Sequence, residues 1–259
     1  MNKIFIEVFE GISREEQLPL AKEIGFEGFF SGPDYAGNMA ELRTFWTLGD
    51  QLGLVYETSH STIPGCYDIW LEGDKGDVYI SQLLRELENC VALNIPTLIV
   101  HIQTNRMENT SLERGLKSLE SLVQAAKEKG VNIAFENADA PEYLYKTLEY
   151  FNEAHVGFCY DSGHEACITP GVRFLPVIGH RLMCTHLHDN DGMTDLHLLP
   201  FDGAIDFKTM CAELKAVGYK GNLTFELRYS EAYAKKMTKA EFLETCYARA
   251  LKLREMINT

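Results

Sequence analysis

The chain has 259 residues, of which 46% are hydrophobic and 24% charged, which is the composition of an ordinary globular protein. Its formal net charge of −14 argues against a nucleic-acid binder, because a field of this sign repels phosphate backbones. No apolar run is long enough to cross a bilayer, and residues 1–10 lack the apolar core of a signal peptide. We therefore expect neither a membrane nor a nucleic acid as partner.

The cysteine content indicates the redox compartment. The seven cysteines form no CxxC pair, their number is odd, and several lie within apolar stretches. We expect reduced thiols in a cytoplasmic protein. Nothing in the sequence marks an interface, so a homo-oligomer stays open.

Short β-rich segments alternate with helical patterns along the whole chain. The expected strands span residues 4–9, 25–30, 54–60, 97–103, 132–137, 156–161, 182–188 and 222–228. The helical spacing of apolar residues is clearest at 111–129, which Gly130 ends, and at 239–257. Strands separated by helices cannot form hairpins, so they must pair in parallel through crossovers.

Eight such units in a chain of this length fit a closed barrel better than an open doubly wound sheet, although the pattern alone leaves the open sheet as an alternative. No linker, low-complexity tract or composition shift divides the chain. The expected fold is an α/β protein, a single (β/α)₈ TIM barrel, with residues 1–259 forming one domain. Its active site is expected at the C-terminal ends of the strands.

Polar residues at the strand ends suggest what this site contains. Six expected strands end in residue types that bind metal ions: His60, His101, Glu136, Asp161, His186 and Glu226. One such histidine alone would more often be a hydrogen-bonded core or loop residue. Burying several unpaired carboxylates is costly, and a divalent cation removes that cost. Because all strand ends meet on one face of a barrel, the pattern predicts a metal site there.

Two loops add further candidates. In Asp161-Ser162-Gly163-His164, a tight turn at Gly163 lets Asp161 and His164 face one site. In the segment HLHDN at 186–190, strand alternation puts His186 and His188 on the same side. The following segment DLH at 195–197 contributes one more carboxylate and one more imidazole, those of Asp195 and His197.

With these motifs, the chain resembles the xylose isomerase-like TIM-barrel superfamily, most closely its sugar phosphate isomerase/epimerase group, with endonuclease IV as a distant relative. The matching segments are FEN (135–137), DSGH (161–164), HLHDN (186–190), DLHLLPFDGAIDF (195–207) and FELR (225–228). The resemblance implies that one metal ion is held by Glu136, Asp161, His186 and Glu226. Oxygen-rich ligation of this kind suits Mn²⁺, Mg²⁺ or Co²⁺, and Zn²⁺ stays open.

The implied reaction is isomerisation or epimerisation of a small sugar or sugar phosphate, by proton transfer next to a carbonyl and through a metal-stabilised enediolate. Glu136 and Glu226 are the expected acid/base pair, without an assignment of which is the base. The expected substrate contacts are His60, His101, His164, His188 and Arg228.

Other residues carry weaker expectations. The family usually has glycine where Phe201 stands, so this ring is expected to narrow or cap the pocket. Trp70, Tyr67 and Phe30 are expected either to form an apolar lid or to pack in the core. Glu7, on the first strand, is expected to be structural or solvated.

The alternative hypothesis is a trinuclear-zinc phosphodiesterase of the endonuclease IV type. That family uses nine ligands, and each has a positional match here: His60, His101, Glu136, Asp161, His164, His186, Asp195, His197 and Glu226. A DNA-processing barrel needs basic, protruding loops, whereas this chain is acidic and its connections are mostly short. The charge therefore favours a sugar as the substrate.

Overall fold

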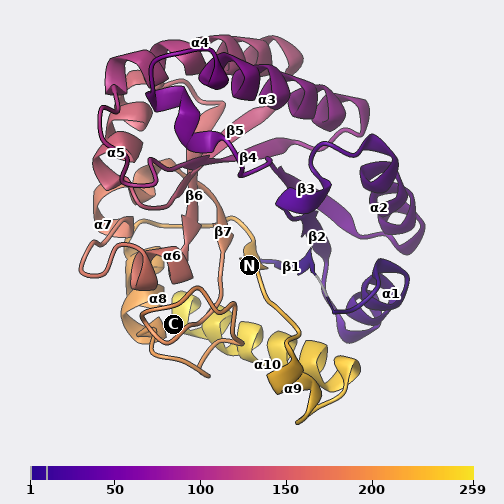
Figure 1. Cartoon of the computed structure of the whole chain (residues 1–259). Helices are drawn as coiled ribbons and strands as arrows, with labels where there is room; N and C mark the ends of the chain where they lie inside the picture. The colour runs from indigo at the N-terminus through magenta and orange to yellow at the C-terminus, as the bar shows by residue number, and fades with distance from the viewer. Residues whose placement is uncertain (1, 10) are drawn as a thin grey trace.

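The computed structural model describes residues 2–9 and 11–259. Its strands are Ile4–Val8 (β1), Gly28–Ser31 (β2), Val55–His60 (β3), Thr97–Ile102 (β4), Asn132–Asn137 (β5), Val156–Asp161 (β6), Leu182–His186 (β7) and Leu223–Phe225 (β8). They pair in parallel, each with its neighbours in the chain, and β8 returns to lie beside β1. The ring closes where the Leu187 N–H donates to Thr224 O (2.9 Å) and the Glu226 N–H donates to Leu187 O (3.2 Å). The expected (β/α)₈ barrel is confirmed (Figure 1).

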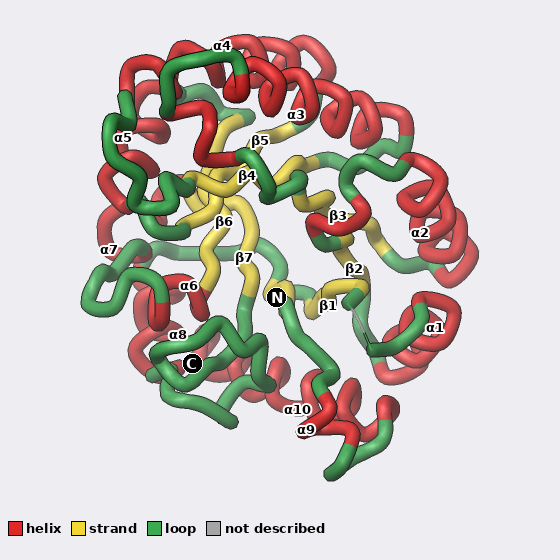
Figure 2. The backbone as a smooth tube through the Cα atoms, viewed as in Figure 1, coloured by secondary structure: helices red, strands yellow, loops and turns green. Residues whose placement is uncertain are grey.

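Helices form the outer ring around these strands, as the separate colours of Figure 2 show. They are Arg14–Ile24 (α1), Met39–Leu52 (α2), Lys75–Ala92 (α3), Leu112–Lys129 (α4), Pro141–Tyr150 (α5), Ser162–Cys167 (α6), Leu175–Ile178 (α7), Phe207–Ala216 (α8), Glu231–Ala234 (α9) and Lys239–Asn258 (α10). Short 3₁₀ turns occupy Pro33–Tyr35 (η1), Cys66–Trp70 (η2) and Gly179–Arg181 (η3). Within the described ranges, no helix combines the length and apolarity that a membrane crossing requires.

The two helices that the sequence marks most clearly begin and end as their capping residues dictate. Ser111 accepts the Arg114 N–H in front of α4, and Gly130, at φ 70°, ends it in the left-handed region. Thr238 and Glu241 form a reciprocal capping box at the start of α10. Local sequence therefore sets the bounds of both helices to within about one residue.

Three strands differ from the sequence prediction by more than one residue at an end. β2 begins at Gly28 rather than at residue 25, because the Gly25 N–H still bonds to Ala21 O and ends α1 at a φ of 121°. β7 ends at His186 and β8 at Phe225, so the predicted last residues of both strands lie in the loops that follow. Beyond them the two segments meet at Leu187, which closes the barrel, and again where the Arg228 N–H donates to His197 O (3.1 Å).

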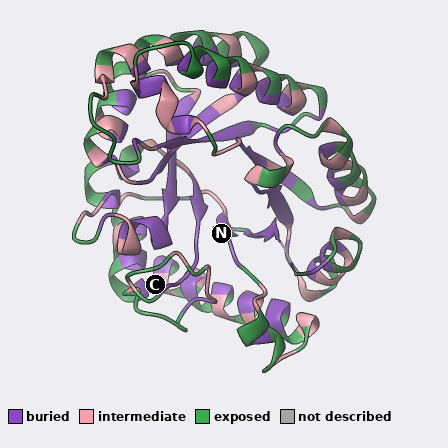
Figure 3. Ribbon diagram, viewed as in Figure 1, coloured by how far each residue is buried: buried purple, intermediate pink, exposed green. Residues whose placement is uncertain are grey.

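Strand alternation decides which side chains face the barrel interior. Ile99, Ala134, Cys159 and Cys184 form a small buried cluster of their own, apart from the large core between strands and helices. Two residues further along β4, β5, β6 and β7 stand His101, Glu136, Asp161 and His186, which therefore face inward one layer higher. Figure 3 shows the buried strands inside the ring and exposed residues on the outer helices. Strand alternation thus places these four polar residues together, one layer above the apolar cluster, which forms the floor of the barrel interior.

All seven cysteines are free, and six of them are buried. Cys159 and Cys184 are register partners on β6 and β7 within the barrel floor. Burial raises the pKa of the Cys159 thiol well above its usual range, and Cys184 beside it adds to the effect. Buried thiols of this kind act as small apolar core residues.

Trp70 belongs to the core and not to a lid. It is fully buried in η2, its Nε1–H donates to Gln103 O (2.9 Å), and its ring meets Tyr143 edge-on at 4.9 Å. Gly115 of α4 lies directly against the indole, and a Cβ on this glycine would overlap the ring carbons. Glycine at this helix position therefore makes room for Trp70.

Gly115→Ala is expected to lower the stability of the fold. Alanine favours helix by about 1 kcal/mol, but forcing a methyl group into a packed core costs about 1–3 kcal/mol, so the clash is expected to win. For a chain of this size a loss of about 1 kcal/mol lowers the Tm by about 2–4 °C. Gly37→Ala is the matched control, because a Cβ on Gly37 would meet nothing within 4 Å. Thermal unfolding checks both variants, and a Tm of Gly115→Ala at or above that of the control would contradict the packing argument.

Candidate metal and substrate site

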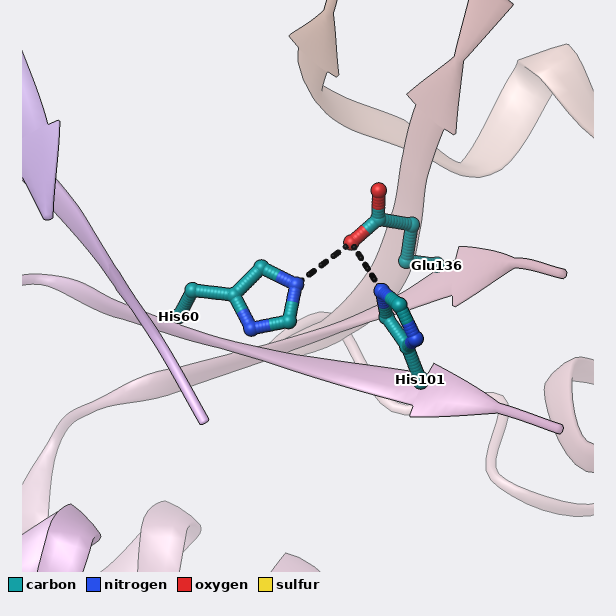
Figure 4. Close-up of side chains that lie close together, drawn as sticks. All are labelled: His60, His101 and Glu136. Carbon is teal, nitrogen blue, oxygen red and sulfur yellow. Dashed lines mark hydrogen bonds and ion pairs between the residues drawn. The ribbon is translucent and has the colours of Figure 1, made fainter. Parts of the chain in front are cut away.

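Glu136 is the centre of the polar cluster at the top of the barrel. Its carboxylate is fully buried, with Oε2 at 3.0 Å from His60 Nε2 and 3.3 Å from His101 Nε2. Figure 4 shows these two rings, from β3 and β4, pointing at the same oxygen. Oε1 lies 3.1 Å from His186 Nδ1 on β7. Imidazoles from three strands thus converge on one carboxylate.

Asp161, at the end of β6, is held from several directions. Its Oδ1 accepts the His164 backbone N–H (2.6 Å) at the start of α6, and both carboxylate oxygens lie 3.1 Å from His188 Nε2. The Asn137 side chain bonds to both backbone groups of Asp161: its Oδ1 accepts the N–H, and its Nδ2 donates to the carbonyl oxygen. A Cβ on Gly163 would overlap the His188 ring, so this glycine makes room for the imidazole that fixes Asp161.

His186 joins the two glutamates of the predicted ligand set. Its Nδ1 lies 3.1 Å from both Glu136 Oε1 and Glu226 Oε2, and its ring stacks on Phe30 at 4.4 Å. Phe30 is therefore a buried support for this imidazole and not part of a lid. One group of buried side chains offers ligand atoms that all lie within 4.8 Å of one another: Glu136, Asp161, His186 and Glu226.

This group fits a divalent cation. Burying three carboxylates without a compensating cation is costly, and oxygen-rich donors with one imidazole suit Mn²⁺, Mg²⁺ or Co²⁺. Glu226 Oε2 is buried and shares its neighbour His186 Nδ1 with Glu136 Oε1, each oxygen lying 3.1 Å from that nitrogen. One imidazole N–H cannot satisfy both carboxylate oxygens, and a cation among the four residues supplies the missing partner.

The electrostatics of the cluster favour ionised carboxylates that face positive charge. Burial alone would raise the pKa of Glu136, but His186 and His101 beside it hold this pKa well below its usual range. Burial would likewise lower the pKa of His186, and Glu136 and Glu226 raise it well above its usual range instead. The carboxylates therefore create a field that attracts cations.

A second group of polar residues lies nearer the mouth of the barrel. Asp195 Oδ2 is 3.1 Å from His197 Nε2 and 3.4 Å from His164 Nε2. Burial would raise the pKa of Asp195, but hydrogen bonds with these two imidazoles hold it well below its usual range. The His197 ring stacks on His188 at 4.2 Å, which connects this group to Asp161.

The loop between β7 and α8 carries Asp195 and His197 and is pinned by one buried side chain. Asp189 accepts backbone N–H groups from Asn190 (2.9 Å), Gly203 (2.8 Å) and Ile205 (3.0 Å). Its main chain also pairs with that of Leu198 in an antiparallel bridge. The motif residues of this loop therefore include a structural anchor in addition to the candidate ligands.

Phe201 adopts the left-handed backbone conformation, at φ 73°, that favours glycine. Its ring packs on Phe207 at 5.0 Å and beneath the Lys252 ammonium at 4.3 Å. The expectation that Phe201 narrows or caps the pocket is therefore wrong, because its ring packs on α8 and α10 and is not part of the cavity wall.

A cavity of about 290 Å³ opens above the cluster. Its wall includes His60, His101, His164, Asp195, His197, Glu226 and Arg228 from the predicted set. Glu136, Asp161 and His186 lie beneath this wall, and His188 is fully buried with its Nε2 toward Asp161. The volume is at the small end of the range for ligand pockets, which suits a small molecule.

Glu7 was missed as a site residue. It is 9% exposed and lines the cavity, so the expectation of a solvated residue is wrong. Burial raises the pKa of Glu7 well above its usual range, and the nearby Glu226 raises it further. The sequence does hold the signal: Ile4, Ile6 and Val8 pack toward the helices, and alternation turns Glu7 to the other face.

Comparisons with known proteins agree with this architecture. A family model described as "Xylose isomerase-like TIM barrel" matches residues 18–246. Protein y4fM of Sinorhizobium fredii is 31% identical over 192 residues, which cover 69% of this chain and 61% of that protein. This chain thus matches only about six-tenths of the length of its curated relatives.

Two solved structures show the same fold at low identity. D-psicose 3-epimerase with D-tagatose from Clostridium cellulolyticum H10 superposes with a TM-score of 0.79 at 13% identity, covering 98% of this chain and 99% of that one. The IOLI protein with a bound zinc atom has a TM-score of 0.76 at 17% identity, covering 97% of each chain. With the family match over most of its length, the chain belongs to the xylose isomerase-like TIM-barrel family.

Proposed function

We propose that this protein is a metal-dependent isomerase or epimerase of a small sugar or sugar phosphate. The observation that carries the proposal is the buried group of Glu136, Asp161, His186 and Glu226 beneath a small cavity lined with imidazoles. The fold is shared with a D-psicose 3-epimerase, which supports the same class of substrate. With its free cysteines, the chain is expected to work in a reducing cytoplasm.

The four residues of this group would hold the cation. Such an ion supplies Lewis-acid polarisation of a carbonyl and stabilises negative charge that develops beside it. The IOLI structure with its bound zinc supports a divalent metal in this fold, and the oxygen-rich donors favour Mn²⁺, Mg²⁺ or Co²⁺.

The chain's own residues would move the proton. Glu226 lines the cavity directly after β8, and His186 holds its pKa below the usual range against the effect of burial, so its side chain is an ionised carboxylate. Glu136 approaches from β5, across the barrel. Removal by one glutamate and return by the other on the opposite face gives epimerisation, whereas return at the neighbouring carbon gives isomerisation. His101 and His164 line the cavity where they can hydrogen-bond substrate oxygens.

Product analysis tests the proposal. The protein is loaded with Mn²⁺ and incubated with D-fructose, D-psicose, D-tagatose and their phosphates, and the products are separated by chromatography. Interconversion of at least one pair is expected. Absence of any new sugar, together with hydrolysis of bis(p-nitrophenyl) phosphate by the zinc-loaded protein, would overturn the proposal.

The trinuclear-zinc phosphodiesterase is the second candidate, and one observation favours it. His60 Nδ1 faces Ser61 O (2.7 Å) and His164 Nδ1 faces Asn137 O (2.9 Å), which leaves Nε2 of each ring toward Glu136 and Asp195, respectively. Metal-binding histidines are commonly oriented in this way by a backbone carbonyl. The residues His60, His101 and Glu136 also form a compact group of ligand atoms on their own.

Metal stoichiometry separates the two candidates. About one ion per chain is expected for the isomerase site, whereas the phosphodiesterase needs about three zinc ions in the arrangement that the resemblance implies. Elemental analysis of the protein purified without chelator gives the number directly. The charge of −14 still weighs against a phosphodiester polymer as substrate.

A further inference from the structure

Glu7 presents a buried carboxylate to the cavity. It stands on β1 opposite Phe30 in the register with β2, and the cavity wall includes it together with Asp34, Glu226 and Arg228. Among residues 2–9 and 11–259, no side chain or backbone group makes a hydrogen bond or ion pair with its carboxylate. Because leaving such a group unpaired is costly, its retention calls for a ligand group.

Gly32 makes the room in which this carboxylate lies. A Cβ on Gly32 would stand 2.5 Å from Glu7 Oε1, which is closer than real Cβ atoms approach oxygen. Its φ of −69° and ψ of 175° are ordinary extended values that any residue adopts. The backbone does not require glycine here, so its role is to leave space for the Glu7 carboxylate.

The backbone that carries Glu7 is held on both sides by one buried side chain. Gln17 of α1 is fully buried, and its Nε2 donates to the carbonyl oxygen of Glu7 (2.5 Å). Its Oε1 accepts the N–H of Phe9 (3.3 Å), the residue at which the chain leaves β1. This clamp fixes the end of the strand, so the Glu7 side chain leaves the backbone in a preset direction.

We propose that Glu7 binds a hydroxyl group of the substrate on the β1–β2 side of the cavity. This assignment rests on the proposed function and deepens it, because it makes the substrate a polyhydroxylated ketose with one hydroxyl group reaching β1. Glu7 is then a substrate-contacting residue outside the metal-ligand group. Gly32 positions it by leaving its carboxylate room.

Calorimetric titration of the Mn²⁺-loaded protein with D-fructose tests the contact. Removing the Glu7 carboxyl group leaves the substrate hydroxyl unsatisfied in the cavity, which is expected to weaken binding about 10- to 100-fold in Glu7→Ala. Glu7→Gln keeps the shape and one acceptor and is expected to lose less. Gly32→Ala, which displaces the carboxylate, is expected to weaken binding in the otherwise native protein and to have no further effect in Glu7→Ala.

Monodeoxy derivatives of D-fructose, each lacking a different hydroxyl, give the decisive comparison. One derivative is expected to bind the native protein as weakly as D-fructose binds Glu7→Ala, and its affinity is expected to be the same in that variant. For each of the other derivatives, Glu7→Ala is expected to weaken binding as much as it does for D-fructose. Manganese content is measured for every variant and is expected to match the native protein, and thermal unfolding shows that each variant is folded.

The possible outcomes distinguish a failure of the Glu7 contact from a failure of the proposed function. Equal loss for D-fructose and all its deoxy forms in Glu7→Ala overturns the hydroxyl contact while leaving the proposed function intact. Loss of manganese in Glu7→Gln also overturns it, because Glu7 would then be a metal ligand. If the native protein holds its manganese but neither binds nor converts D-fructose, D-psicose, D-tagatose or their phosphates, the proposed function fails and the contact fails with it.

Discussion

Glu136→Gln is expected to lose both metal and turnover. Glu136 is fully buried and faces imidazoles from β3, β4 and β7, so every partner in the cluster is arranged around its negative charge. Glutamine keeps the shape but removes the charge that binds a cation. Removing even an outer-shell partner costs about 10- to 100-fold in metal affinity, and a loss beyond that range is expected for a ligand. Losing the acid/base group reduces turnover about 10²- to 10⁴-fold in addition.

Glu57→Gln is the matched control, because Glu57 is a half-buried strand glutamate outside the metal group. Glu57 lies on β3, and its carboxylate accepts hydrogen bonds from Asn222 (2.7 Å) and Thr224 (2.5 Å). Each of its two carboxylate oxygens therefore has a hydrogen-bond donor within the protein. Metal content and turnover are measured for both variants with the sugar that the native protein converts. The control is expected to keep its metal and its activity. Full turnover in Glu136→Gln would contradict the assignment of this residue.

Chelation is expected to lower the thermal stability substantially. A ligand present at about 100 times its Kd stabilises the folded state by about 2.7 kcal/mol. In a chain of this size that corresponds to about 5–10 °C in Tm. The physical reason is the buried group of three carboxylates, whose mutual repulsion a bound cation relieves. Differential scanning calorimetry with EDTA and after addition of Mn²⁺ measures the shift.

The same scan on a second variant shows whether the stabilisation comes from this site. Asp161→Asn removes one carboxylate of the group, and the Tm of this variant is expected to respond weakly to Mn²⁺. A native protein whose Tm is unchanged by EDTA at any Mn²⁺ concentration would show that the carboxylate group binds no cation under these conditions.

The barrel and most of the site were predictable from the sequence, because both depend on the period of two residues in a strand. Once Ile99, Ala134 and Cys159 are placed on the inner face, His101, Glu136 and Asp161 follow two residues later. The roles of these side chains in binding and catalysis stay predictions. The same alternation on the first strand identifies Glu7, whose neighbours on either side are apolar.

Features that depend on tertiary packing could not be predicted. Phe201 lies against α8 and α10 although its loop position suggested a cap. His188 alternates correctly with His186, but it turns under Asp161 because Gly163 leaves room for its ring. Trp70 is held by Gly115 of a helix more than forty residues away in the chain. Such contacts join distant segments, so no local pattern reveals them.

Exchange of substrate hydrogen with solvent tests the central claim most directly. The Mn²⁺-loaded protein is incubated in D₂O with the ketose that it binds, and the recovered sugar is examined by NMR and mass spectrometry. The account predicts one deuterium at the carbon next to the carbonyl, formed by the native protein and Glu57→Gln but not by Glu136→Gln or Glu226→Gln. Turnover of the sugar without deuterium at that carbon in the native protein would contradict proton transfer by these two glutamates.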